Sequence, residues 1–136
     1  MEKSNVTNVI HKLYESYQTE DMELHATVMA QDKDMVNFGT DIAEHHVGWE
    51  AWKESHIAQW EAIDKTEISS TDLTVFLAET GNVAWFSDIT NWSIVVQGDT
   101  LNINNARLTG VLEKRGDKWK IVQIHVSIPK DEIIAY

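Results

Sequence analysis

The chain has 136 residues and a formal net charge of -11, from 22 acidic and 11 basic side chains. Phosphate backbones and anionic headgroups repel such a protein, so we expect neither nucleic-acid binding nor membrane binding. The absence of cysteine excludes disulfides and thiolate chemistry. With no apolar run long enough to span a bilayer and no secretory h-region at the start, this composition predicts one cytoplasmic domain over residues 1–136.

The first half of the chain predicts helices. Apolar spacing indicates helices over residues 4–19, 19–32 and 49–64, a short strand over 34–39 and a loop over 41–48. Ser4 is the expected N-cap of the first helix. The third helix should bury one wide stripe, formed by Trp49, Trp52, His56, Trp60 and Ile63.

The second half predicts strands. Four runs rich in Val, Ile, Thr and Trp, over residues 66–81, 82–98, 100–116 and 118–128, are separated by short glycine turns. Such tight connections make successive strands antiparallel neighbours. The sequence therefore predicts an α+β fold: three N-terminal helices packed on a strongly curved, mainly antiparallel sheet, a cone with a central pocket.

The last run, WKIVQIHVS (119–127), carries apolar side chains on both faces of a regular strand. Something must cover the second face, and we expect a homodimer formed through the outer face of the sheet. If Lys114 pairs with Trp119, a regular ladder places Arg107 and His125 on opposite faces. One bulged residue would reverse that result.

Three segments resemble a known family. They are EDMELHATVMAQDKDMVNFGTD (20–41), Glu44 with Gly48, and the hairpin ARLTGVLEKRGDKWKIVQIHVS (106–127). Together they are similar to the SnoaL-like branch of the nuclear transport factor 2-like superfamily, whose members are cystatin-like α+β cones. The resemblance implies either an isomerase, cyclase or dehydratase, or a non-catalytic association domain.

Three residues are candidates for acid–base catalysis. Asp88 is a carboxylate inside an apolar, tryptophan-flanked strand, where burial would raise its pKa; alternatively, it caps a bend or faces solvent. His125 is either an acid–base group on the pocket wall or a structural histidine. The resembled superfamily includes steroid isomerases. When their sequences are aligned on Gly48, the position of their catalytic base corresponds to residues 38–40 of this chain, and Asp41 is the nearest carboxylate. Their hydroxyl donor on the first helix has only Tyr14 and Tyr17 as loose counterparts.

A second set of residues is expected to bind a ligand: Trp49, Trp52, Trp85, Trp92, Arg107 and Ser127. The tryptophans would form an aromatic wall or pack as core. Arg107 would clamp an anionic group or form an ion pair with Asp88 or Asp41. Adjacent His45 and His46 point in different directions, so we expect a loop over the pocket mouth there, with no metal site and no cofactor.

These patterns predict a protein that binds a small apolar molecule, with isomerase-, cyclase- or dehydratase-like chemistry open to it. The alternative is an association module whose sheet face mediates oligomerisation. A third interpretation is a regulator that contacts other proteins through its acidic surface.

Overall fold

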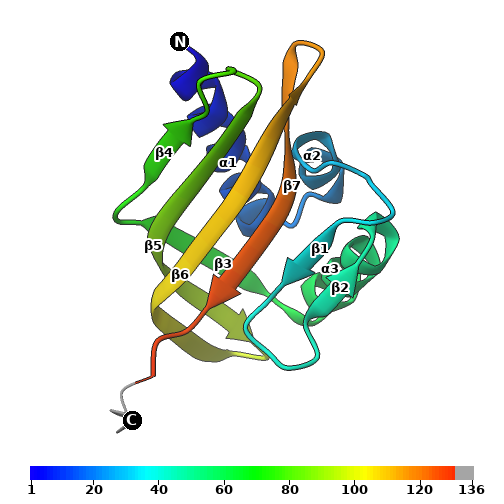
Figure 1. Ribbon diagram of the computed structural model, residues 1–136. Coiled ribbons are helices and arrows are strands. Elements are labelled where there is room, and N and C mark those ends of the chain that lie inside the picture. The colour runs from blue at the N-terminus through cyan, green and yellow to red at the C-terminus, as the bar shows by residue number, and fades with distance from the viewer. Residues whose placement is uncertain (131–136) are drawn as a thin grey trace, which may run out of the picture.

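The computed structural model describes residues 1–130, and three helices pack on one face of a curved seven-stranded sheet (Figure 1). The elements are α1 (Glu2–Thr19), α2 (Met22–Val28), β1 (Val36–Phe38), β2 (His45–Val47), α3 (Trp49–Ala62), β3 (Lys65–Ser70), β4 (Thr74–Leu77), β5 (Val83–Val96), β6 (Asp99–Arg115) and β7 (Lys118–Ser127). The strand order is β2-β1-β7-β6-β5-β3, with β4 also paired to β5. Only the β1–β7 pair of named strands is parallel. The predicted α+β class is confirmed.

Four local predictions differ from the structure. The first helix begins at Glu2 without a side-chain cap, so Ser4 is not its N-cap. The second helix is shorter than expected at both ends: Asp21 caps its start through the backbone N–H of Leu24, and after Val28 the chain becomes extended and Met29 pairs with Ile121. Part of the expected loop over 41–48 forms β2. The run over 66–81 is divided into β3 and β4, since the backbone N–H of Asp72 turns inward to bond Asp88.

The core lies between the helices and the concave face of the sheet. Val6, Ile10 and Leu13, at helical spacing on α1, are fully buried there. The α3 stripe is confirmed through Trp60, although Ile63 follows the helix as its C-cap. Within residues 1–130, no helix is both long enough and apolar enough to cross a membrane.

A bulge in β7 decides which side chains face the helices. Ile121 pairs with Leu112 and Gln123 with Val111, so Val122 is the extra residue. Beyond it, His125 pairs with Thr109 and Ser127 with Arg107. The alternation expected for WKIVQIHVS therefore breaks in the middle. Lys114 does pair with Trp119, as predicted.

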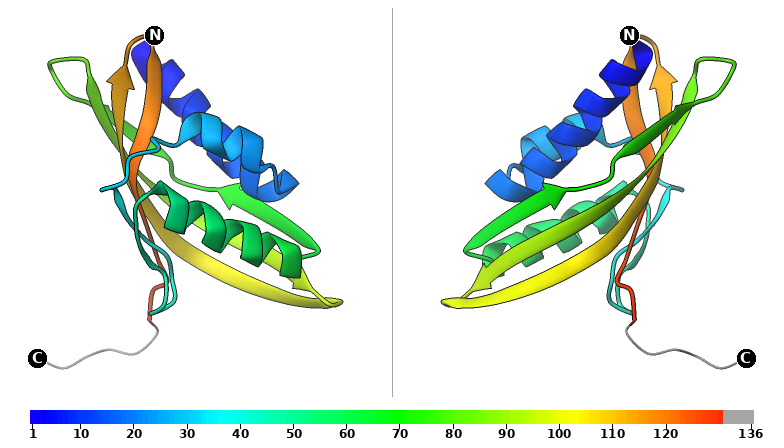
Figure 2. Two further views of the ribbon diagram at one scale, coloured as in Figure 1. Left: turned by 90° about the vertical axis from the view of Figure 1, so that its right-hand side faces the viewer. Right: turned by 90° about the vertical axis from the view of Figure 1, so that its left-hand side faces the viewer.

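A second bulge bends the β5–β6 hairpin. Thr90 pairs with Ala106, yet Trp92 pairs with Ile103, so two residues of β6 oppose one of β5. Asn105 adopts a left-handed backbone (φ 59°), and its N–H donates to Oδ1 of Asn91 at 2.9 Å. The end of the hairpin curves beneath α3 (Figure 2). This curvature encloses a pocket.

Candidate functional site

The α3–sheet pocket lies between α3, the end of α1 and the curved ends of β5 and β6, and has a volume of about 230 Å³. Its lining residues are Tyr17, Gly39, Thr40, Glu44, Trp52, His56, Gln59, Trp92, Ile94, Leu101, Ile103, Ala106 and Val126. The β5–β6 hairpin supplies an apolar and aromatic wall. The polar side chains come from the helices and from the turn between β1 and β2.

A hydrogen-bonded pair, Tyr17 and His56, stands on the helical side of the pocket. Nδ1 of His56 lies 2.8 Å from the carbonyl oxygen of Trp52. A carbonyl can only accept, so Nδ1 carries the proton and Nε2 of the neutral ring is an acceptor. The Tyr17 hydroxyl, 2.7 Å from Nε2, therefore donates to it. The proton of Tyr17 is directed into the protein.

A second histidine fixes this arrangement from behind. The indole N–H of Trp52 donates to Nε2 of His25 at 2.9 Å, so Nδ1 of His25 carries the proton and donates to Ser16. The Ser16 hydroxyl in turn donates to the carbonyl of Leu13. Each hydrogen bond from Trp52 through His25 to Ser16 has one defined direction. These bonds hold Trp52 in place, and the Trp52 carbonyl in turn orients the ring of His56.

Burial keeps this cluster neutral. Desolvation lowers the pKa of His25 to about 3 and that of His56 to about 4. Burial, followed by the negative charge of Glu44, raises the pKa of Tyr17 above its ordinary value. At neutral pH the pocket therefore holds an uncharged phenol bonded to an uncharged imidazole.

Glu44 is the only acidic side chain among the described lining residues. The β1–β2 turn holds its backbone, since the carbonyl of Glu44 accepts from Gly39 and its N–H donates to Asp41. Its carboxyl lies where a side chain at Gly39 would be, because a Cβ at that position would overlap Oε2 of Glu44. Burial is the largest cause of the raised pKa of Glu44, and the charge of Asp41 adds to it.

The predicted ligand-binding tryptophans lie in three environments. Trp52 and Trp92 line the pocket. Trp49 is buried behind it, stacked against His25. Trp85 is 44% exposed on the convex face and stacks on Phe76 at 5.7 Å.

The predicted catalytic residues do not converge on the pocket. Asp88 is buried and accepts hydrogen bonds from Tyr14, Ser70 and Asp72. His125 is exposed beside Phe38, with 5.2 Å between ring centroids. Asp41 is exposed in the β1–β2 turn and bonds the N–H of Ala43.

Arg107 and Ser127 complete the set of predicted residues. They pair with each other across β6 and β7, and because of the Val122 bulge they share the convex face with His125. Arg107 is exposed, and none of the ion pairs among residues 1–130 includes it. The bulge brings these three residues together, but on the side of the sheet away from the helices.

The polar residues of the pocket carry weak sequence signals. Tyr17 and His56 both sit on apolar helical stripes, where spacing alone indicates core packing. Glu44 lies in a turn and, with Gly48, contributed to the family resemblance, but no sequence pattern marked it as a pocket residue. Within residues 1–130, no group of three or more acidic, histidine or cysteine side chains is arranged to hold a metal ion.

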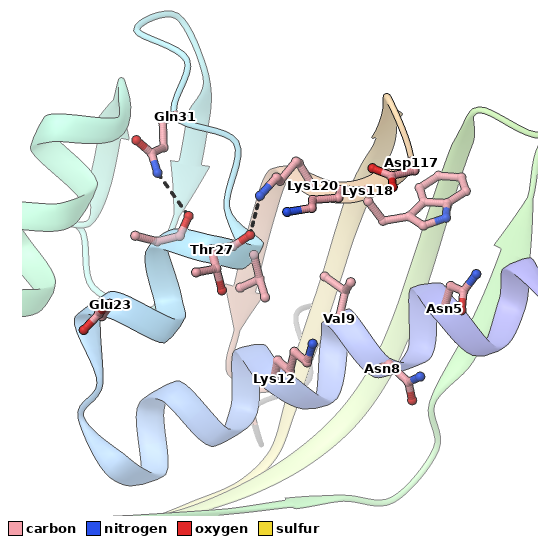
Figure 3. A pocket seen from close by; sticks show the side chains of 13 residues that line it. Asn5, Asn8, Val9, Lys12, Glu23, Thr27, Gln31, Asp117, Lys118 and Lys120 are labelled. Atoms are coloured by element: carbon pink, nitrogen blue, oxygen red, sulfur yellow. Dashed lines mark hydrogen bonds between the residues drawn. The ribbon is translucent and has the colours of Figure 1, made fainter.

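A larger groove, of about 640 Å³, lies between α1, α2 and the start of β7 (Figure 3). Lys12, Lys118 and Lys120 line it, and Lys120 donates to the carbonyl of Thr27. Most of its lining residues are polar or charged: amides, lysines, two acidic residues and a threonine. It is a poorer site than the α3–sheet pocket for a small apolar molecule.

Solved structures share this architecture. A nuclear transport factor 2-like family protein from Streptomyces avermitilis, proposed to be a dehydratase, superposes with a TM-score of 0.83 at 16% identity, over 93% of this chain and 95% of the other. A nuclear transport factor 2-like superfamily protein from Salmonella enterica gives 0.86 at 19%, over 98% and 94%. A Xanthomonas campestris protein, proposed to be a calcium/calmodulin dependent protein kinase II association domain, gives 0.78 at 21%, over 93% and 87%.

These similarities define an α+β cone of the nuclear transport factor 2-like, cystatin-like type. Residues 6–131 match the SnoaL-like domain, and the chain belongs to that family. Comparison with curated proteins found no match. The family resemblance expected from the sequence is confirmed.

Proposed function

We propose that this protein binds a small, largely apolar molecule in the α3–sheet pocket, and that Tyr17, His56 and Glu44 supply acid–base chemistry to it. The observation that carries the proposal is the 2.7 Å hydrogen bond between the Tyr17 hydroxyl and His56, in a pocket whose hairpin wall is apolar. A mostly apolar pocket with a few convergent polar groups is typical of small-molecule sites.

Glu44 is the best general base of the three. The pKa of Glu44 is raised, which brings it closer to physiological pH and so favours proton transfer. The Tyr17 oxygen can accept a hydrogen bond from a bound molecule, because its own proton is directed to the neutral ring of His56. Removing and returning protons serves an isomerisation, a cyclisation or a dehydration. The likeness to a proposed dehydratase supports this class, while Asp88, His125 and Asp41 carry no step in it.

Ligand screening with a blocked pocket tests the proposal. Aromatic, steroid-like and polyketide-like compounds are screened by thermal shift against the wild type and against Ile103→Trp. Ile103 is a half-exposed lining residue, so an indole there fills the pocket with little disturbance of the core. We expect compounds that stabilise only the wild type. Stabilisation of both proteins by the same compounds, or of neither by any, rejects the pocket as the site.

A second candidate function rests on the convex face. Phe76 and Trp85 are 43% and 44% exposed and stack on each other there. Exposed aromatic side chains are enriched in protein interfaces. We propose that this face forms the homodimer expected from the sequence, and the likeness to a proposed association domain supports it.

A further inference from the structure

The side chains that line the α3–sheet pocket have few hydrogen-bond donors to offer. The Tyr17 hydroxyl donates to His56, and Nδ1–H of His56 donates to a backbone carbonyl. The indole N–H groups of Trp52 and Trp92 donate to His25 and to Thr90. These bonds leave no donor from any of the four rings for a bound molecule.

The remaining polar atoms are mainly acceptors. The Tyr17 oxygen keeps its lone pairs, and Glu44 offers a carboxylate. Gln59 uses one amide hydrogen on Ser55 and keeps its carbonyl oxygen. The uncharged donors left are the second amide hydrogen of Gln59 and the exposed hydroxyl of Thr40. None of the described lining residues is a lysine or an arginine.

We infer that the natural ligand of the α3–sheet pocket is a small amine: a compact cyclic apolar body carrying an ammonium group that donates to Glu44 and to the Tyr17 oxygen. This inference rests on the proposed function, because it names the class of molecule bound in the same pocket. Carboxylates, and ketones that need a donor, are selected against.

Three features favour an ammonium over other donors. Glu44 supplies the opposite charge from a half-buried position, where desolvation costs less than in the core. The indole ring of Trp92, a half-buried lining residue, adds an aromatic surface to the pocket, and aromatic rings attract cations. The net charge of -11 raises the local concentration of cations around the chain. A neutral alcohol satisfies the same acceptors but lacks the attraction between opposite charges.

Four ligands with one ring system separate the head groups: 2-aminoindane, 2-indanol, 2-indanone and indane-2-carboxylate. Each is titrated by calorimetry at pH 8, against the wild type and the Ile103→Trp variant. We expect the amine to bind the wild type about tenfold more tightly than the alcohol. The ketone should bind more weakly still, the carboxylate should show no binding, and the variant should bind none of the four.

Two carboxylate variants test where the preference arises. Glu44→Gln should weaken amine binding about tenfold and alcohol binding by much less, because the amide oxygen of glutamine still accepts from a hydroxyl; the retained alcohol binding reports that the pocket is intact. Glu54→Gln makes the same charge change at an exposed site on α3, outside the pocket, and should leave both affinities unchanged.

The outcomes separate the two proposals. A ketone or carboxylate that binds the wild type as tightly as the amine, and loses binding in Ile103→Trp, overturns the amine inference and leaves the pocket proposal standing. Equal losses of amine binding in Glu44→Gln and Glu54→Gln also overturn it, because net charge would then explain the preference. No binding by any of the four compounds counts against both proposals.

Discussion

The hydroxyl of Tyr14 donates a 2.7 Å hydrogen bond to Oδ2 of Asp88, and both side chains are buried. This bond connects α1 to the middle of β5. The same carboxylate accepts from the Ser70 hydroxyl and from the backbone N–H of Asp72, at the break between β3 and β4. One carboxylate thus joins α1, β3, β5 and the turn that leads into β4.

Asp88 should therefore matter for stability. Replacing it with alanine leaves the buried Tyr14 hydroxyl and the N–H of Asp72 without a partner, which we expect to cost about 3 kcal/mol in urea unfolding. Tyr14→Phe removes one bond and no charge, and should cost about 1 kcal/mol. If Asp88→Ala kept wild-type stability and lost ligand binding, Asp88 would be a site residue, as the sequence suggested.

Acid should destabilise the protein through its buried histidines. The pKa values of His25 and His56 fall from 6.5 in the unfolded chain to about 3 and about 4 when folded. Below pH 6.5 the unfolded state therefore binds more protons than the folded state, so the free energy of unfolding falls as the pH falls. By pH 5.5 the two histidines should together cost about 3 kcal/mol relative to pH 7.5.

Urea unfolding between pH 7.5 and 5.5 measures this loss. His25→Gln and His56→Gln should each remove about half of the pH dependence, whereas His11→Gln, at an exposed position on α1, should leave it intact. Glu44 and Glu20 have raised pKa values and contribute with the opposite sign, so a background that carries Glu44→Gln and Glu20→Gln isolates the histidines. A flat profile in that background would show that the histidines are charged when folded.

Gly39 should control the position of Glu44. An alanine Cβ there would overlap Oε2 of Glu44, so the carboxyl must leave its place in the pocket. We expect Gly39→Ala to cost about 1 kcal/mol and to weaken binding of 2-aminoindane about tenfold. Gly81→Ala should cost a similar amount through its positive φ, with nothing within 4 Å of the new Cβ, and keep ligand affinity. Equal ligand affinity in both variants would contradict the role given to Glu44.

The convex face should control oligomeric state. Trp85→Lys places a charge in the exposed aromatic pair with Phe76, and should raise the dimer dissociation constant by at least about tenfold in sedimentation velocity. Ile57→Lys makes the same kind of change at an exposed apolar position on α3, and should leave it unchanged. A wild type that sediments as a monomer at micromolar concentration would reject the dimer.

Helical spacing predicted the helices and the α3 stripe, but it did not distinguish pocket from core. Tyr17 and His56 recur at the same intervals as their buried apolar neighbours. What separates them is the hydrogen bond between side chains 39 positions apart in sequence, which no local pattern encodes. Glu44 belongs to the site because Gly39 makes room for its carboxyl, another contact that spacing does not reveal.

The last strand shows a second limit of pattern reasoning. Strict alternation placed Ile121 and His125 on one face. The extra residue Val122 separates them, so Ile121 faces the core and His125 faces outward. A bulge forms where the curvature of the whole sheet requires it, and WKIVQIHVS carries no glycine or proline to mark the position.

The hairpin beyond Asn91 and Asn105 offers an engineering opportunity. The hydrogen bond from the Asn105 N–H to the Asn91 side chain divides β5 and β6 into two parts. One part contributes to the core beneath α1, and the other part forms the pocket wall. Four pocket-lining residues lie in the hairpin between the two asparagines: Trp92, Ile94, Leu101 and Ile103. A library that varies residues 92–104 while keeping both asparagines would therefore exchange the wall as a cassette, and would change which molecules fit without rebuilding the core.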